Sequence, residues 1–236
     1  MGVDWRLYAA RVIVALDPPA GVDPVSWAER IASRLGGVAA GVKIGLPLLL
    51  RAGYEAAARL LDGIEGLRVA DLKLADIAPV MESIVEPLLP HVDAVIAHAF
   101  VGGRGALTEL RGLLERFDVR LVLVYHMSHP GASSTFGRCI DVIDEVVESV
   151  RPWGLVAPAT MPDVVRRARS RYPDVVVMSP GVGAQGAEPG EAICAGADYE
   201  IIGRSVTRAE DPLEALRRLS ERGAEKLEAC RHSLSL

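Results

Sequence analysis

The feature that most limits the fold is a regular alternation of two kinds of segment along the chain. Eight short segments are rich in Val, Ile, Leu and Ala, as expected for strands buried on both faces of a parallel sheet. They cover residues 11–17, 39–45, 68–73, 93–98, 119–126, 153–158, 174–180 and 199–203. Each is followed by a segment with apolar residues at helical spacing, at 24–35, 47–62, 79–89, 104–117, 140–150, 162–171, 189–196 and 211–229.

Eight strand and helix units without a linker between them predict an α/β fold of one domain over residues 1–236. The count favours a (β/α)8 TIM barrel. A doubly wound open sheet is the alternative, because it is also built from alternating strands and helices.

The composition excludes several classes of partner. The formal net charge is −5, and no run of Lys or Arg occurs, so neither nucleic acid nor a membrane surface is expected as the main partner. No apolar stretch approaches the roughly 18 residues of a transmembrane helix, and the N-terminus lacks a secretory pattern. Cys139, Cys194 and Cys230 are odd in number and widely spaced. They predict reduced thiols and a cytoplasmic protein.

Polar residues gather where the predicted strands end. In a TIM barrel the functional groups lie at the carboxyl ends of the strands, so these residues are expected on one face of the barrel. They are Asp17, Lys43, Asp71, Lys73, Asp76, His98, Ser128, the glycine-rich segment 181–186, Gly203 and Arg204.

The third predicted strand ends in the pattern D-x-K-x-x-D, formed by Asp71, Lys73 and Asp76. Asp71 and Lys73 are two residues apart on a strand, so their side chains are expected to point the same way into the barrel mouth. Only three of the 26 basic residues are lysines, and two of them, Lys43 and Lys73, end neighbouring strands. Arginine cannot release a proton in a protein, whereas lysine can. The placement therefore predicts a general acid, with a buried ion network lacking chemistry as the alternative.

The segment SPGVGAQGAEPG follows the seventh predicted strand and contains Gly181, Gly183, Gly186 and the only glutamine, Gln185. A dinucleotide-binding fingerprint would follow the first strand instead. In TIM barrels the loops after strands seven and eight commonly bind phosphate. We therefore expect a phosphate-binding loop that closes over its ligand, with an ordinary glycine loop as the alternative.

Two histidines, His126 and His129, have the spacing of one helical turn, but Pro130 and Gly131 indicate a loop, and no carboxylate or cysteine cluster completes a metal shell. We expect no metal site. His91, His98 and His232 are expected to be structural or exposed.

Assembled, these segments resemble the orotidine 5'-monophosphate decarboxylase family from end to end. The matching pieces are ALD at 15–17, VKIGLPL at 42–48, DLKLADI at 71–77, MSHPGA at 127–132, SPGVGAQG at 179–186 and IIGRS at 201–205. The resemblance implies a barrel that dimerises with its active sites at the subunit interface. It also implies conversion of orotidine 5'-monophosphate to uridine 5'-monophosphate with neither a metal nor an organic cofactor.

The resemblance also implies roles for individual residues. Lys73 would protonate carbon 6 of the pyrimidine, and Asp71 would lie against the departing carboxylate. The remaining roles are ribose binding by Lys43 and Asp17, a catalytic contact to the partner's site by Asp76, pyrimidine contacts by Ser128 and Pro180, a further substrate contact by Ile77, and phosphate binding by Gln185, Gly203 and Arg204. Val80 stands where family members often carry a hydroxyl residue, so one ribose contact from the partner is expected to be missing.

Two rival functions share parts of this pattern. A metal-dependent sugar-phosphate decarboxylase or aldolase also carries D-x-K-x-x-D, but a metal-binding carboxylate tends to replace Lys43 there, and a lysine would repel the ion. A catalytically silent phosphate-binding barrel is disfavoured by the presence of Lys73, Asp71 and Asp76 together.

Overall fold

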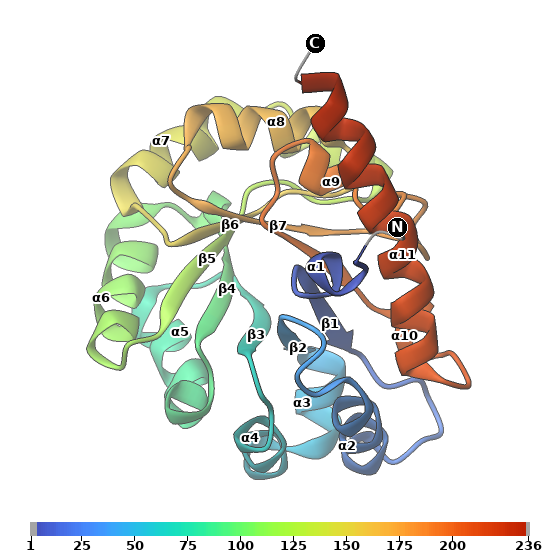
Figure 1. Ribbon diagram of the computed structural model, residues 1–236. Helices are drawn as coiled ribbons and strands as arrows, with labels where there is room; N and C mark the ends of the chain where they lie inside the picture. Colours follow the sequence, from blue (N-terminus) through green and yellow to red (C-terminus); the bar gives the residue numbers. More distant parts are fainter. Residues whose placement is uncertain (1–3, 235–236) are drawn as a thin grey trace.

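Eight parallel strands close into a barrel in the computed structural model, which describes residues 4–234 (Figure 1). The strands are β1 Val12–Leu16, β2 Gly41–Gly45, β3 Leu67–Leu74, β4 Ala94–His98, β5 Arg120–Val124, β6 Gly154–Val156, β7 Val176–Pro180 and β8 Tyr199–Ile202. Each pairs with the next, and β8 pairs with β1, so the sheet has no free edge. This closure confirms the predicted single-domain TIM barrel and excludes the open sheet.

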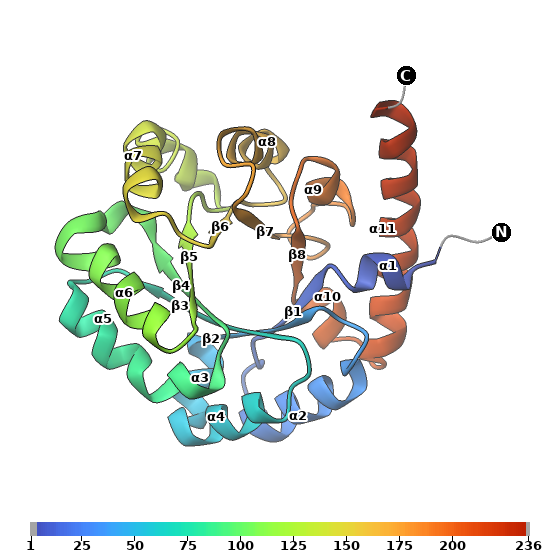
Figure 2. The same ribbon diagram turned by 60° about the vertical axis from the view of Figure 1, so that its left-hand side comes forward.

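The strands are buried on both faces, which explains their nearly continuous apolar sequences. Every residue of β1, β2 and β4 is buried. A ring of helices surrounds the strands (Figure 2). In such a barrel, side chains that point inward fill the interior and those that point outward pack against the helices, and the buried apolar residues form one cluster.

The helical segments lie between the strands, as expected. Three of them, α2 Pro24–Leu35, α7 Ile140–Val150 and α8 Pro162–Arg171, have the predicted bounds. The others are α1 Arg6–Ala9, α3 Leu46–Ala52, α4 Tyr54–Asp62, α5 Ala78–Val85, η1 Glu86–His91, η2 Ala99–Val101, η3 Gly103–Leu107, α6 Thr108–Arg116, η4 Pro130–Ser134, α9 Glu191–Cys194, α10 Arg204–Thr207 and α11 Pro212–Leu234. Within residues 4–234, none of these helices combines the length and apolar character needed to cross a membrane.

Three predicted helices differ from the prediction, each for a local reason. The segment 104–117 becomes a regular α-helix only at Thr108, because Arg104 and Gly105 have non-helical backbone angles. The segment 47–62 is divided at Gly53, whose positive φ of 81° ends α3 before α4 begins. The segment 79–89 changes into the tighter η1 at Glu86, because Pro87 and Pro90 lack the amide hydrogens that an α-helix requires.

The prediction of three reduced cysteines is wrong for two of them. Cys194 at the end of α9 and Cys230 in α11 form a disulfide with a Cα to Cα distance of 6.1 Å. Cys139 is a free, exposed cysteine. The spacing of 36 residues along the chain carried no sign of this pairing, which exists because α9 and α11 pack against each other in the barrel (Figure 1).

Candidate active site

A cavity of about 400 Å³ opens at the carboxyl ends of the strands. Its apolar floor is formed by Ile96, Val124, Val156 and Ile201, one from each of four strands. The structure brings nine of the eleven predicted site residues into its lining: Asp17, Lys43, Asp71, Lys73, Ser128, Pro180, Gln185, Gly203 and Arg204.

Four charged groups alternate in sign along one side of the cavity. The Lys43 ammonium lies 3.0 Å from the carboxylate of Asp71 and 3.9 Å from that of Asp17. The Lys73 ammonium lies 2.7 Å from both Asp71 oxygens. Asp71 and Lys43 have side chains only 8% and 9% exposed, whereas that of Lys73 is 41% exposed. The inner pair is therefore fixed, and the Lys73 ammonium faces the space that a ligand would occupy.

The two inner groups keep their charges because they neutralise each other. Burial by itself would raise the pKa of Asp71, but the ammonium groups of Lys43 and Lys73 hold it below its ordinary value. Burial would lower the pKa of Lys43, but the carboxylates of Asp71 and Asp17 outweigh that effect and raise it. A carboxylate and an ammonium are thus both present in the cavity near neutral pH.

The backbone at Lys73 departs from regular strand geometry. Its φ is +45°, a left-handed conformation that non-glycine residues adopt rarely, and the pairing of β3 with β4 shifts register between Ala70 and Leu74. The simple alternation expected from the sequence therefore does not explain why Lys73 and Asp71 share a side of the strand. Such a conformation costs about 1–3 kcal/mol and is commonly found at functional sites. Here it lets the ammonium turn back onto the Asp71 carboxylate.

The glycine-rich loop after β7 makes a tight double turn over the cavity. Gly181, Gly183 and Gly186 have φ values of +114°, +73° and +104°. The Gly183 amide donates to the carbonyl of Ala187, and the Gly186 amide donates to that of Gly183. A side chain on Gly183 would collide with the hydroxyl of Ser205, so this glycine also allows the loop to approach α10 closely.

A hydrogen bond joins two of the predicted binding residues across the cavity. The Ser128 hydroxyl, after β5, donates to the side-chain oxygen of Gln185 in the glycine-rich loop at 2.8 Å. This bond holds the Gln185 side chain in the cavity that Gly203 and Arg204 also line.

Sequence reasoning missed Arg208 in the lining of the cavity and Gly45 next to its charged cluster. Arg208 lines it one helical turn after Arg204. This i to i+4 spacing was the available signal, since it places two side chains on the same face of a helix. Gly45 lies behind the charged cluster, where a side chain would come within 2.8 Å of Asp17 Oδ1. Only glycine at this position leaves room for the Asp17 carboxylate.

Two predicted site residues lie outside the cavity of this single chain. Asp76 is exposed and accepts a hydrogen bond from the amide of Ile77, which is 60% exposed. Both lie directly after β3, at the rim of the barrel mouth.

The histidines occupy separate positions. His126 lines the cavity, and His129 precedes η4. His98 is buried beside Phe100 and Phe136, and burial lowers its pKa, with the Lys73 ammonium acting in the same direction. Across the part of the chain from 4 to 234, no three His, Cys, Asp or Glu residues are placed to hold a metal ion together.

Comparison with known proteins decides the family. Residues 10–219 match the model of the family described as orotidine 5'-phosphate decarboxylase / HUMPS. The chain belongs to this family. It is 53% identical to the orotidine 5'-phosphate decarboxylase of Aeropyrum pernix over 215 residues, 89% of this chain and 87% of the relative. It is 38% identical to the enzyme of the same name from Saccharolobus solfataricus, over 95% of this chain and 97% of the relative.

Solved structures agree with this placement. The decarboxylase from Sulfolobus solfataricus matches with a TM-score of 0.84 and 38% identity, covering 92% of this chain and 99% of that one. The decarboxylase from Methanocaldococcus jannaschii, solved in complex with the inhibitor BMP, matches with a TM-score of 0.81 and 27% identity over 90% of this chain and 97% of that one. The enzymatic class is therefore that of the orotidine 5'-phosphate decarboxylases, which act in pyrimidine biosynthesis.

Proposed function

We propose that the protein converts orotidine 5'-monophosphate to uridine 5'-monophosphate without a metal ion or an organic cofactor, and that Lys73 is the proton donor. One observation carries the proposal: an accessible ammonium, 2.7 Å from a buried carboxylate, faces a cavity closed on its other side by a glycine-rich loop. Membership of the family supports the substrate, and the geometry of the cavity supports the roles proposed for Lys73 and Asp71.

In the proposed chemistry the Lys73 ammonium acts on the substrate, and the Asp71 carboxylate holds that ammonium. The bond between carbon 6 and the carboxylate breaks, carbon dioxide leaves, and the electron pair stays on carbon 6. The Lys73 ammonium stabilises that charge as it develops and transfers a proton to the carbon, and the resulting amine regains a proton from water. Asp71 holds the ammonium in place through both carboxylate oxygens.

The rest of the cavity would hold the nucleotide. Gln185, Gly203 and Arg204 would bind the phosphate, and we add Arg208 as a second cation on the same helix face. Lys43 and Asp17 would bind the ribose hydroxyls, and Ser128 and Pro180 would contact the base above the apolar floor. A relative was solved in complex with the inhibitor BMP, which supports a small-molecule ligand for this family. Phosphate binding far from the reacting carbon would supply energy for loop closure.

Lys43 argues against the metal-dependent members of this fold. Its ammonium lies within 3.9 Å of the Asp17 carboxylate and 3.0 Å of the Asp71 carboxylate. A divalent cation would have to displace a buried positive charge that these carboxylates already neutralise. The two carboxylates of the cluster are thus neutralised by the ammonium groups of the protein itself.

We further propose a homodimer in which Asp76 and Ile77 reach the partner's site. Large apolar side chains are exposed in the segments that directly follow β2, β3 and β4, on one side of the barrel mouth: Leu46, Leu50, Ile77, Val80 and Phe100. Exposed apolar groups gathered on one side of a protein are typical of an interface. A second copy packed there would bury them and place Asp76 beside the neighbouring cavity.

The direct test is an assay of orotidine 5'-monophosphate decarboxylation, followed by ultraviolet absorbance, in the presence of EDTA. We expect full turnover with the chelator. Lys73→Ala should lose at least about 1,000-fold in kcat, and Lys73→Arg should not restore it, since arginine keeps the charge but cannot give up the proton. Both variants should still bind uridine 5'-monophosphate. Activity that disappeared with EDTA and returned with Mg²⁺, or near-normal turnover of Lys73→Ala, would refute the proposal.

A further inference from the structure

The cavity does not account for a buried carboxylate that lies behind it. Glu200 is in β8, and its side chain points away from the barrel interior, because its neighbour Ile201 lines the cavity. Glu200 is fully buried, as is Tyr8 of α1, whose hydroxyl donates a hydrogen bond to it. A buried carboxylate is costly unless hydrogen-bond donors surround it.

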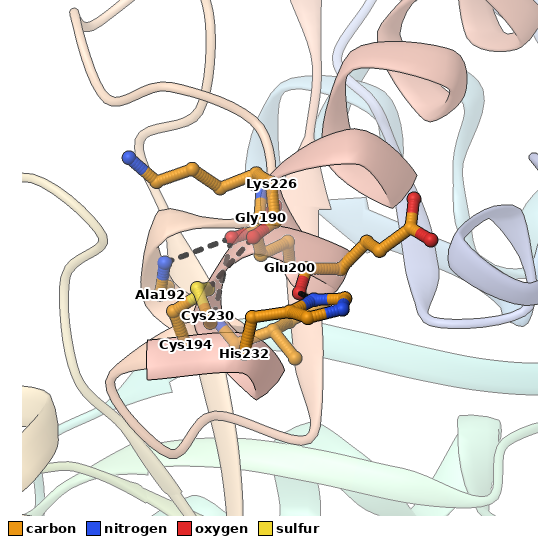
Figure 3. The surroundings of a disulfide bond; sticks show 9 residues. Gly190, Ala192, Cys194, Glu200, Lys226, Cys230 and His232 are labelled. Carbon is orange, nitrogen blue, oxygen red and sulfur yellow. Dashed lines mark hydrogen bonds between the residues drawn. A yellow bond between two sulfur atoms is a disulfide. The ribbon is translucent and has the colours of Figure 1, made fainter. Parts of the chain in front are cut away.

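The other donors to Glu200 come from one short segment of backbone. The amide of Gly190 lies 3.0 Å from Oε2, and the amides of Ala192 and Ile193 lie 3.0 and 3.4 Å from Oε1. Burial raises the pKa of Glu200, while the Gly190 amide and the other donors oppose that shift. Figure 3 shows Glu200 beside Gly190 and Ala192, next to the disulfide between Cys194 and Cys230.

Gly190 is where the glycine-rich loop after β7 ends and α9 begins. Its φ is +87°, and a side chain there would lie within 2.9 Å of the carbonyl of Gly223 in α11. A side chain on Gly223 would in turn collide with the Tyr8 ring. Tyr8 and Gly190 therefore lie against the same turn of α11, and the Glu200 carboxylate accepts a hydrogen bond from each of them.

The position of Glu200 in its strand connects this junction to the other half of the phosphate site. Gly203 and Arg204 follow it by three and four residues on the same chain segment. One side chain thus ties the end of the glycine-rich loop to the strand that presents Arg204.

We propose that Glu200, supported by Tyr8, is a positioning residue for phosphate binding: its carboxylate fixes the end of the glycine-rich loop relative to Gly203 and Arg204. This inference rests on the proposed function of that loop. It assigns no contact with the substrate to either residue.

The test compares the affinities of uridine 5'-monophosphate and uridine, which differ only by the phosphate. Calorimetric titration gives both dissociation constants for the wild type, Tyr8→Phe and Glu200→Gln. We expect Tyr8→Phe to weaken nucleotide binding by about 5-fold and Glu200→Gln by about 10-fold or more, with uridine affinity unchanged. A purely structural role would move both ligands together or neither.

Tyr172→Phe is the matched control. The Tyr172 hydroxyl also belongs to a buried residue and donates to a buried carboxylate, that of Asp144, but it lies after α8, and its hydrogen bonds are to Asp144 and Arg171, not to the loop. It should lower thermal stability while leaving the ratio of the two affinities at the wild-type value. If Glu200→Gln does not fold, the two affinities of Tyr8→Phe alone test the proposal.

Two outcomes overturn the inference in different ways. If the wild type prefers the nucleotide, Arg204→Ala removes that preference, and both Tyr8→Phe and Glu200→Gln retain it, then Glu200 does not position the site and the proposed phosphate loop stands. If the wild type binds uridine as tightly as the nucleotide, the proposed phosphate site fails and this inference fails with it.

Discussion

At the scale of single residues, the site depends on how buried charges neutralise one another. Asp71 contacts two ammonium groups, one buried and one accessible, so its carboxylate serves as the shared counter-ion of the cavity. The charged groups of the cluster are therefore expected to titrate together, and the contribution of each group can be measured only by substituting it.

Asp71 should contribute to stability in a defined pH range. Its folded pKa lies below its ordinary value of 3.8, so its contribution is present above that value and is lost as the pH falls through the folded pKa. Asp71→Asn should unfold at a lower temperature than the wild type at neutral pH, and the difference should shrink as the pH falls below about 4. Thermal unfolding followed by circular dichroism measures this. Asp174→Asn, at an exposed position, is the control, and a difference that stayed constant down to pH 2 would contradict the expectation.

Arg208 should contribute to phosphate binding through charge. It directly follows α10, is exposed, and lines the cavity four residues after Arg204. Arg208→Ala should raise KM about 5- to 10-fold with little change in kcat, and the effect should weaken at high salt. Steady-state kinetics at two ionic strengths test this. Arg116→Ala, exposed at the end of α6 on the opposite side of the barrel, should change nothing, and an unchanged KM for Arg208→Ala would remove Arg208 from the site.

At the scale of elements, the last helix holds several parts of the barrel together. α11 packs against α1, α2, α9 and α10, and the disulfide joins it to α9. This helix lies on the side of the barrel where β8 pairs with β1 (Figure 2).

Removing the disulfide should lower the stability of the fold while leaving the chemistry intact. A crosslink that spans 36 residues restricts the unfolded chain and is worth about 3–4 kcal/mol. The variant Cys194→Ser/Cys230→Ser should melt about 5–10 °C below the oxidised wild type, and reduced wild type should match the variant. Differential scanning calorimetry measures both. Cys139→Ser is the control, since that thiol is free, and equal melting temperatures for oxidised wild type and the double variant would show that the crosslink contributes nothing.

At the scale of the whole molecule, the single chain leaves Asp76 and Ile77 outside its own cavity. Exposed apolar side chains lie beside them on the rim. A dimer through that rim would explain both observations, because each cavity would then be completed by the other copy.

Mixed dimers provide the test. Lys73→Ala and Asp76→Asn should each be nearly inactive as a homodimer. In a dimer of one Lys73→Ala chain and one Asp76→Asn chain, one of the two sites has both native residues. Mixed dimers, isolated after co-expression by purification through two different tags, should therefore have about half of wild-type activity. Absence of any restored activity in verified mixed dimers would show that Asp76 serves its own chain.

The sequence by itself determined the barrel, most helix positions and the polar groups at its mouth. The spacing of apolar residues that distinguishes strands from helices is visible within short stretches of sequence. In a parallel barrel the carboxyl ends of all strands lie on one face. Residues that end different strands could therefore be placed together without coordinates, as for Lys43, Asp71, Lys73 and Arg204. Only the tertiary structure decided the Cys194–Cys230 pair, the left-handed backbone at Lys73 and the link from Glu200 to Gly190. Each of these depends on how separate segments pack in space, and that packing leaves no periodic trace along the chain.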